Sequence, residues 1–138
     1  MYLLDTNVIS ELRKAINGRA DRQVVKWEAG VSRASLYLSV ITILELEIGV
    51  LQMERRDALQ GRLLRVWLDR HVLPAFEGHI LGIDPEIAPR CARLHVPNPQ
   101  NEGDAMMAAT ALVHGMTIVT RNVRDFEGTG VKLLNPWE

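Results

Sequence analysis

Short, mostly apolar runs rich in β-forming residues recur along this chain, and helical segments separate them. The runs cover residues 2–4, 35–40, 79–83, 116–120 and 131–134. Most of them are apolar on both faces, which is typical of strands buried in a parallel sheet that is covered on two sides. The alternation predicts an α/β fold, a three-layer α/β/α sandwich with a short parallel sheet of four or five strands. At 138 residues, the whole chain, 1–138, is expected to form a single domain.

The intervening segments carry helical signals. We expect helices over residues 8–14, 21–29, 43–53, 55–71, 85–94 and 104–114. Thr42 is the predicted N-cap of the 43–53 helix, which is apolar on nearly every side and should be largely buried. Within it, Glu45 and Glu47 project about 160° apart, so they cannot share one site. The 55–71 helix has an apolar stripe of Leu59, Leu63, Val66 and Trp67 opposite a charged stripe of Arg55, Arg62, Arg65 and Asp69.

Composition excludes several classes of function. The net charge of −1 argues against a general polyanion binder, so binding to nucleic acid would need a local basic face or bridging metal ions. The arginines of the charged stripe are more typical of a solvated face than of such a surface. Cys91 is the single cysteine, which excludes an internal disulfide, and the histidines lack zinc-ligand spacing. Without a signal peptide or membrane span, the cytoplasm is the expected location.

Four acidic positions follow predicted strands or open the helices after them. Asp5 follows the first strand, Glu45 lies early in the helix after the second, and Asp104 opens its helix. Asp125 lies just beyond the strand 116–120. The carboxyl ends of parallel strands share one edge of a sheet, where ligands gather. If these acids meet, they would raise one another's pKa, and a hard divalent cation, Mg²⁺ or Mn²⁺, would relieve the repulsion. Such a cation supports hydrolysis of a phosphodiester.

Each acid also has a purely structural explanation. Asp5 could cap the following helix, Asp104 could serve the helix macrodipole, and Asp125 could be a cap or a solvated acid. Glu45, in a mostly apolar helix, is the hardest to explain without a function. Further residues fit an active site: hydroxyl and amide side chains to orient the acids, and small residues to admit a substrate backbone. These are Thr6, Asn7, Thr120, Gly49, Ala108 and Ala111.

Four motifs in order along the chain resemble those of PIN-domain ribonucleases. They are "LLDTNVIS", "SVITILELEIGV", "GDAMMAATALVHGMTIVTRNVRDF" and "NPW". The chain is most similar to VapC-type toxins of bacterial toxin–antitoxin pairs, especially their FitB-like branch. This resemblance implies a magnesium- or manganese-dependent endoribonuclease, usually a homodimer. It also implies a small DNA-binding antitoxin that plugs the acidic groove.

The resemblance also assigns site residues. By position, Asp5, Glu45 and Asp104 match the three family acids that hold the metal, and Thr120 matches the adjacent hydroxyl residue. The place of the family's fourth acid falls on Asn122, which can accept a hydrogen bond but supplies no charge. Asn122, or Asp125 from the next turn, would then orient the attacking water, and a second metal would be held less strongly.

Two other functions compete with this hypothesis. A PIN-like scaffold that binds RNA or protein without catalysis is the main alternative, favoured only by the missing fourth acid. A phosphatase of the haloacid dehalogenase type would need a second aspartate two residues after Asp5, where Asn7 stands.

Overall fold

All five strands of the single sheet run parallel. The computed structural model describes residues 1–138, and its strand order is β3-β2-β1-β4-β5. The strands are β1 (Tyr2–Leu4), β2 (Leu36–Ser39), β3 (Ile80–Leu81), β4 (Thr117–Val119) and β5 (Lys132–Leu134). Every neighbouring pair is parallel, so all carboxyl ends lie along one edge. The predicted α/β fold with a short parallel sheet is therefore confirmed.

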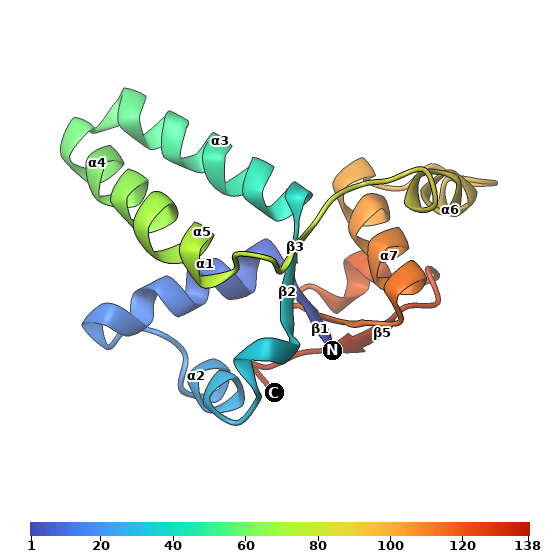
Figure 1. The fold of residues 1–138 in the computed structure, drawn as a ribbon, viewed down its shortest axis with the longest axis horizontal. Helices are drawn as coiled ribbons and strands as arrows, with labels where there is room; N and C mark the ends of the chain where they lie inside the picture. Colours follow the sequence, from blue (N-terminus) through green and yellow to red (C-terminus); the bar gives the residue numbers. More distant parts are fainter.

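Helices cover both faces of the sheet. They are α1 (Thr6–Arg13), α2 (Arg22–Ala29), α3 (Val40–Arg56), α4 (Ala58–Trp67), α5 (Leu73–Ala75), α6 (Ile87–Leu94) and α7 (Glu102–His114). A π-helical turn over Leu68–Val72 joins α4 to α5, and a short 3₁₀ helix, η4, spans Val123–Phe126. Figure 1 shows α1 to α5 on one side of the strands and α6 and α7 on the other. No helix combines the length and apolar character needed to cross a bilayer.

Successive residues of the central strands enter opposite cores. Leu4 and Val119 belong to the core beneath α1 to α4, whereas Leu3 and Ile118 pack with Phe126 beneath α7. All five are buried. This alternation follows from the period of two in a strand, and burial of both faces explains why the central strands β1 and β4 carry no charge.

Three helices, α1, α3 and α7, begin two or three residues earlier than predicted. The expectation that Thr42 caps α3 is wrong: α3 starts at Val40, and the Ser39 hydroxyl accepts the N–H of Ile41 at 3.0 Å. Ser39 ends β2 in an extended conformation, so it passes directly into the N-cap position. Similarly, α7 begins at Glu102 and is capped by Asn101, so Asp104 lies in its first turn rather than at its start.

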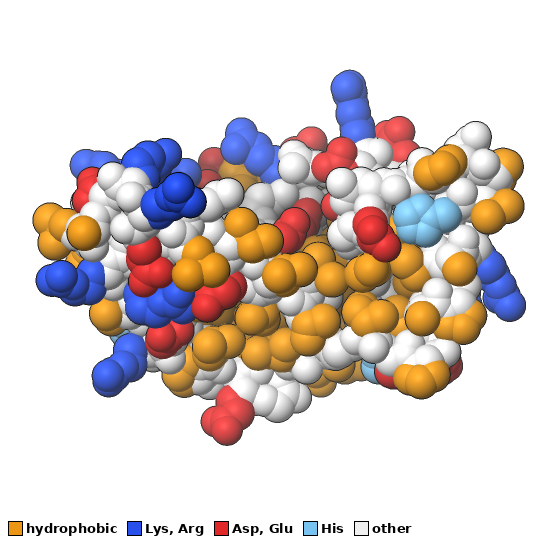
Figure 2. Space-filling view, turned by 90° about the horizontal axis from the view of Figure 1, so that it is seen from above, with side chains coloured by type: hydrophobic (Ala, Val, Ile, Leu, Met, Phe, Trp, Pro, Cys, Tyr) orange, Lys and Arg blue, Asp and Glu red, His pale blue; other side chains and the backbone are white.

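The expectation that α3 is largely buried is also wrong. Only its face carrying Thr42, Leu46 and Val50 is buried. Its apolar outer face is exposed, and most of the predicted apolar stripe of α4 is exposed as well. The exposed residues are Val40, Leu44, Ile48, Leu51, Leu59, Leu63 and Val66. Figure 2 shows hydrophobic side chains across the middle and lower part of one face, while most Lys and Arg side chains gather at one end and acidic side chains also lie near the centre.

The predicted helix over residues 55–71 is interrupted at Asp57. This residue ends α3, and its carboxylate accepts the N–H groups of Leu59 and Gln60 at 3.2 Å each, which starts α4. The two helices then pack closely, because a side chain at Gly61 would overlap the backbone of Glu54. The α3–α4 hairpin extends beyond the sheet, which is why so much of its apolar surface is uncovered.

Candidate active site

Asp5 occupies the turn between β1 and α1 and is held by three donors. Its Oδ1 accepts the N–H of Thr6 at 2.8 Å, so it is the N-cap of α1. Its Oδ2 accepts the hydroxyl of Thr120 at 2.8 Å and the amide of Asn7 at 3.3 Å. Thr120 is fully buried at the end of β4. Asp5 therefore caps a helix and also presents a fixed carboxylate at the edge of the sheet.

Glu45 reaches the same edge from α3. The hydroxyl of Thr6 donates to its Oε1 at 2.5 Å, which links the residue after Asp5 to the second acid. Glu45 is exposed. Glu47 points elsewhere, with its Oε2 2.6 Å from Nη1 of Arg65. The prediction that the two glutamates cannot share a site is therefore confirmed.

Asp104 and Asp125 complete a cluster of four acids. Burial, followed by the negative charges of Asp125, Asp5 and Glu45, raises the pKa of half-buried Asp104 to about 6. The pKa of Asp5 is also raised, chiefly by burial, although its hydrogen bonds from Thr120 and Thr6 act in the opposite direction. Glu45 and Asp125 add to this increase. We refer to Asp5, Glu45, Asp104 and Asp125 as the carboxylate cluster.

Asn122 lies beside this cluster but is uncharged, so it does not affect the pKa of Asp5 or Asp104 as the acids do. Its backbone N–H donates to the hydroxyl of Thr120 at 3.0 Å, and its side chain is exposed. Asp125, on η4, carries the charge that acts on Asp5 and Asp104. Asn7 links α1 to the segment after β4, because its Oδ1 accepts the N–H of Arg121 at 3.3 Å. The fourth negative charge at this edge thus comes from Asp125.

The donor set of the cluster suits a hard divalent cation. Its members are all carboxylates, and none forms an ion pair with a basic side chain. As the side chains stand, no three His, Cys, Asp or Glu residues are arranged to enclose a metal ion. The acids nevertheless raise one another's pKa, and a cation that drew them together would remove that repulsion. Oxygen donors of this kind fit Mg²⁺ or Mn²⁺.

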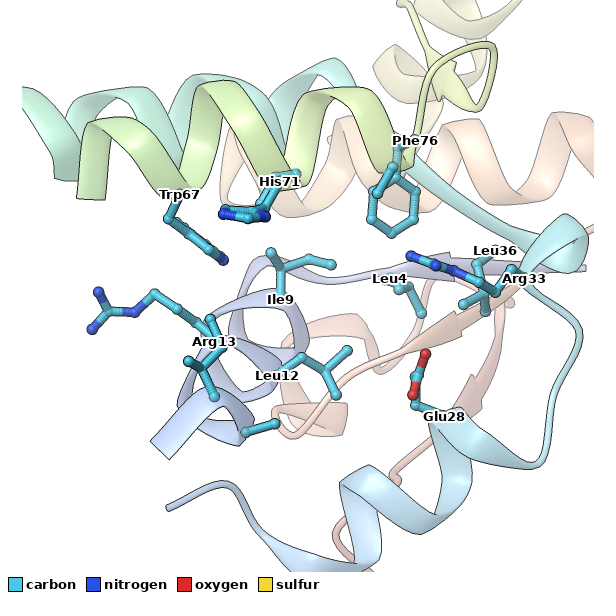
Figure 3. A pocket seen from close by; sticks show the side chains of 14 residues that line it. Leu4, Ile9, Leu12, Arg13, Glu28, Arg33, Leu36, Trp67, His71 and Phe76 are labelled. Atoms are coloured by element: carbon cyan, nitrogen blue, oxygen red, sulfur yellow. The ribbon is translucent and has the colours of Figure 1, made fainter. Parts of the chain in front are cut away.

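An apolar cavity of about 280 Å³ lies away from these acids, between α1, β2 and the α4–α5 segment. Figure 3 shows Trp67, at the end of α4, and His71, in the π-helical turn that follows, projecting towards Ile9. Leu4 and Phe76 lie further along the cavity. No member of the carboxylate cluster lines this cavity. It is therefore not the place for phosphodiester chemistry.

A second cavity, of about 270 Å³, adjoins the cluster and includes residues that the motifs did not single out. It lies between α1, α3 and α4, and Ser10, Arg13 and Lys14 line it together with Thr6 and Glu45. The i, i+4, i+7 spacing of Thr6, Ser10 and Arg13 places them along one face of α1. That spacing predicts from the sequence that the three side chains share a face of α1. It does not predict that this face lies close to α3 and lines a cavity with it.

Comparisons with known proteins agree with the fold described above. The PIN domain model matches residues 2–132. The VapC ribonuclease Y4jK of Sinorhizobium fredii is 38% identical over an alignment of 146 positions, covering all of this chain and 99% of the relative. Toxin FitB of Neisseria gonorrhoeae is 34% identical over 99% of both chains.

Solved structures give the same result. The crystal structure of FitAcB from Neisseria gonorrhoeae contains a chain that superimposes with a TM-score of 0.89 at 33% identity, covering 100% of this chain and 99% of that one. A toxin–antitoxin complex from Klebsiella pneumoniae gives a TM-score of 0.68 at 28% identity, with coverage of 100% and 99%. The match to the family model and the full-length relatives agree, and the chain belongs to the PIN domain family.

Proposed function

We propose that this protein is a metal-dependent endoribonuclease and the toxin of a type II toxin–antitoxin pair. The observation that carries the proposal is the carboxylate cluster: four acids, from the β1–α1 turn, α3, α7 and η4, lie close enough at one edge of the sheet for their charges to act on one another, and no basic side chain neutralises them. The names of the full-length relatives, a VapC ribonuclease and toxin FitB, support the same activity and biological role.

In this proposal Asp5, Glu45 and Asp104 hold a Mg²⁺ or Mn²⁺ ion. When bound, the ion supplies positive charge to the scissile phosphate and lowers the pKa of a water molecule. Thr120 and Asn7 fix the carboxylate of Asp5 by donating hydrogen bonds to it. Such supporting residues orient metal ligands and commonly tune metal affinity.

Asp125 and Asn122 are the candidates to orient the attacking water. Either side chain offers an oxygen that accepts a hydrogen bond, but only Asp125 adds negative charge at this edge. Its charge reaches both Asp5 and Asp104, which supports Asp125 as the functional substitute for the family's fourth acid.

The proposed partners are an RNA substrate, a small DNA-binding antitoxin and a second copy of the toxin, all in the cytoplasm. The solved structure from Klebsiella pneumoniae, which is similar over the whole chain, is titled a toxin–antitoxin complex. An antitoxin that covered the acidic edge would keep RNA away from it.

The test is magnesium-dependent cleavage of RNA by the purified chain. We expect cleavage with Mg²⁺ or Mn²⁺, none with a chelator, and none from Asp104→Asn, which removes one charged ligand. Glu77→Gln is the matched control, because Glu77 is exposed and follows α5, far along the chain from the cluster. Cleavage that survives both the chelator and Asp104→Asn would overturn the mechanism.

A non-catalytic PIN-like module that binds RNA or protein is the second candidate. Asn122 at the place of the fourth acid, together with the open arrangement of the carboxylates, favours it. In that case the wild-type chain would bind RNA and leave it intact in the presence of every divalent cation tested.

A further inference from the structure

The cavity between α1, α3 and α4 joins the carboxylate cluster to two basic side chains. We call it the α1–α3 pocket. The residues used in the argument are Thr6, Glu45, Ser10, Gly49, Arg13 and Lys14. Thr6 and Glu45 belong to the end of the pocket at the sheet edge, where the Thr6 hydroxyl contacts the glutamate. Arg13 and Lys14 lie about two turns further along α1.

The charge of Arg13 is available to a ligand. Its guanidinium lies 5.7 Å from the centre of the Trp67 ring and forms no ion pair with a carboxylate. Stacking on an aromatic ring orients a guanidinium while leaving its outer N–H donors free. Lys14 is exposed and pairs at 3.3 Å with Glu11, which also accepts the backbone N–H of Asp21.

Gly49 keeps the wall of the pocket open, and the fold gives no other reason for it. It lies inside α3, one turn after Glu45, and a Cβ added there would meet no atom within 4 Å. Glycine in a helix interior weakens the helix relative to alanine. Packing therefore does not require glycine at this position, in contrast to Gly61, whose missing side chain allows α4 to approach α3.

We propose that the α1–α3 pocket binds the nucleotide next to the scissile phosphate of single-stranded RNA, a proposal that rests on the proposed ribonuclease function. Arg13 and Lys14 bind its phosphate, and Ser10 and the open position at Gly49 lie beside its ribose. The carboxylate cluster repels a polyanion, so substrate affinity has to come from nearby cations. The volume of about 270 Å³ lies just below the usual range for ligand pockets, roughly 300–1,000 Å³, which suits one sugar-phosphate unit.

The first experiment measures RNA affinity without cleavage. The full chain is titrated into a short fluorescein-labelled single-stranded RNA of mixed sequence, in a chelator, and anisotropy is followed at several salt concentrations. We expect Arg13→Gln/Lys14→Gln to weaken binding about tenfold or more, because a charged contact to phosphate is lost. The slope of log affinity against log salt should decrease by about 0.7 for the one phosphate released. Arg90→Gln, on distant α6, is the matched control and should bind normally.

The second experiment alters the wall of the pocket and leaves its charge unchanged. Gly49→Met should fold with an unchanged or higher Tm and bind the same RNA about tenfold more weakly, because its side chain fills the open space. Gly49→Ala should bind nearly as well as the wild type. In cleavage with Mg²⁺, both Gly49→Met and the double variant should raise KM more than they lower kcat.

The outcomes separate this proposal from the proposed function. If the wild type cleaves RNA but the double variant and Gly49→Met bind RNA as it does, the pocket assignment is overturned and the ribonuclease stands. Loss of antitoxin binding with unchanged RNA affinity would identify the pocket as a protein-binding site, which also overturns the assignment. If the wild type neither binds nor cleaves RNA, both proposals fail.

Discussion

The chain contains two groups of acidic side chains, one paired with an arginine and the other without any basic partner. Near the α3–α4 hairpin, three carboxylates gather around Arg65: those of Glu47 at 2.6 Å, Glu54 at 3.4 Å and Asp69 at 3.6 Å. The hydrogen bonds to Glu54 and Glu47 raise the pKa of Arg65 above its usual range. At the sheet edge, the carboxylate cluster has no such cation, and the pKa of Asp104 is raised to about 6.

The difference shows what the sheet edge lacks. The guanidinium of Arg65 stabilises three carboxylates that would otherwise repel one another, so in that group the negative charge is balanced by a side chain of the same protein. At the sheet edge the repulsion remains, and the supporting donors Thr6, Thr120 and Asn7 are all uncharged. We infer that the missing positive charge is supplied from outside, by a divalent cation, and the following predictions test this contrast.

The largest expected effect is on activity. Asp5→Asn keeps an N-cap for α1 but removes one charge from the cluster, so RNA cleavage should decrease by about 10²-fold or more. Expression of this variant without an antitoxin should no longer arrest growth. The matched change in the other group is Glu54→Gln, which should leave cleavage unchanged because Arg65 retains Glu47 and Asp69. Toxicity of Asp5→Asn equal to that of the wild type would contradict the contrast.

The second prediction concerns stability and metal. A ligand that binds only the folded state at about 100 times its Kd adds roughly 2.7 kcal/mol to the free energy of unfolding. Mg²⁺ or Mn²⁺ at that concentration should therefore raise the Tm by about 6–11 °C, and a chelator should reverse the increase. Glu54→Gln should show the same increase, and Asp104→Asn should lose most of it. An equal increase in Asp104→Asn would place the metal elsewhere.

The layers of this fold followed from local sequence patterns. Strands buried on both faces are mostly apolar and uncharged, so runs such as residues 2–4 and 117–119 indicated a parallel sheet. Helix boundaries and exposure were less predictable. Nothing in the 43–53 segment distinguishes an apolar face packed on the sheet from one left uncovered, because that depends on how far the hairpin extends. That residues 1–138 form one domain stays a prediction.

The candidate site also contains residues that local sequence patterns predict and residues that only the tertiary arrangement reveals. Asp5, Glu45 and Asp104 could be proposed because each lies at a strand end or an early helix turn, and the structure brings these positions together. Their role as metal ligands stays a prediction. The sequence alone also fits Asp125 as a cap or a solvated acid, and only the position of η4 in the structure reveals that its charge acts on Asp5 and Asp104. Gly49 was already expected to leave room for a substrate backbone, but a role for Arg13 required the approach of α1 to α3, which no local pattern encodes.

The smallest expected effect is the pH dependence of stability in the absence of metal. The pKa of Asp104 is about 6 in the folded chain against an ordinary value of 3.8. The folded state therefore binds the proton more tightly than the unfolded state does. The favourable contribution of the protonated form is complete below about pH 3.8, decreases as the pH rises to 6, and is absent above that value.

Asp104→Asn, which mimics the protonated carboxyl, should therefore be more stable than the wild type at pH 7 in a chelator. A shift of about two pKa units corresponds to roughly 3 kcal/mol, but Asp104 is half-buried and screened by solvent, so a gain of about 1 kcal/mol is expected. Denaturant titrations at pH 7 and pH 4 measure it, and the difference from the wild type should be much smaller at pH 4. Asp69→Asn, in the group around Arg65, should give no gain at either pH, because there the charge is already neutralised within the chain. A gain in Asp69→Asn as large as in Asp104→Asn would remove the distinction between the two groups.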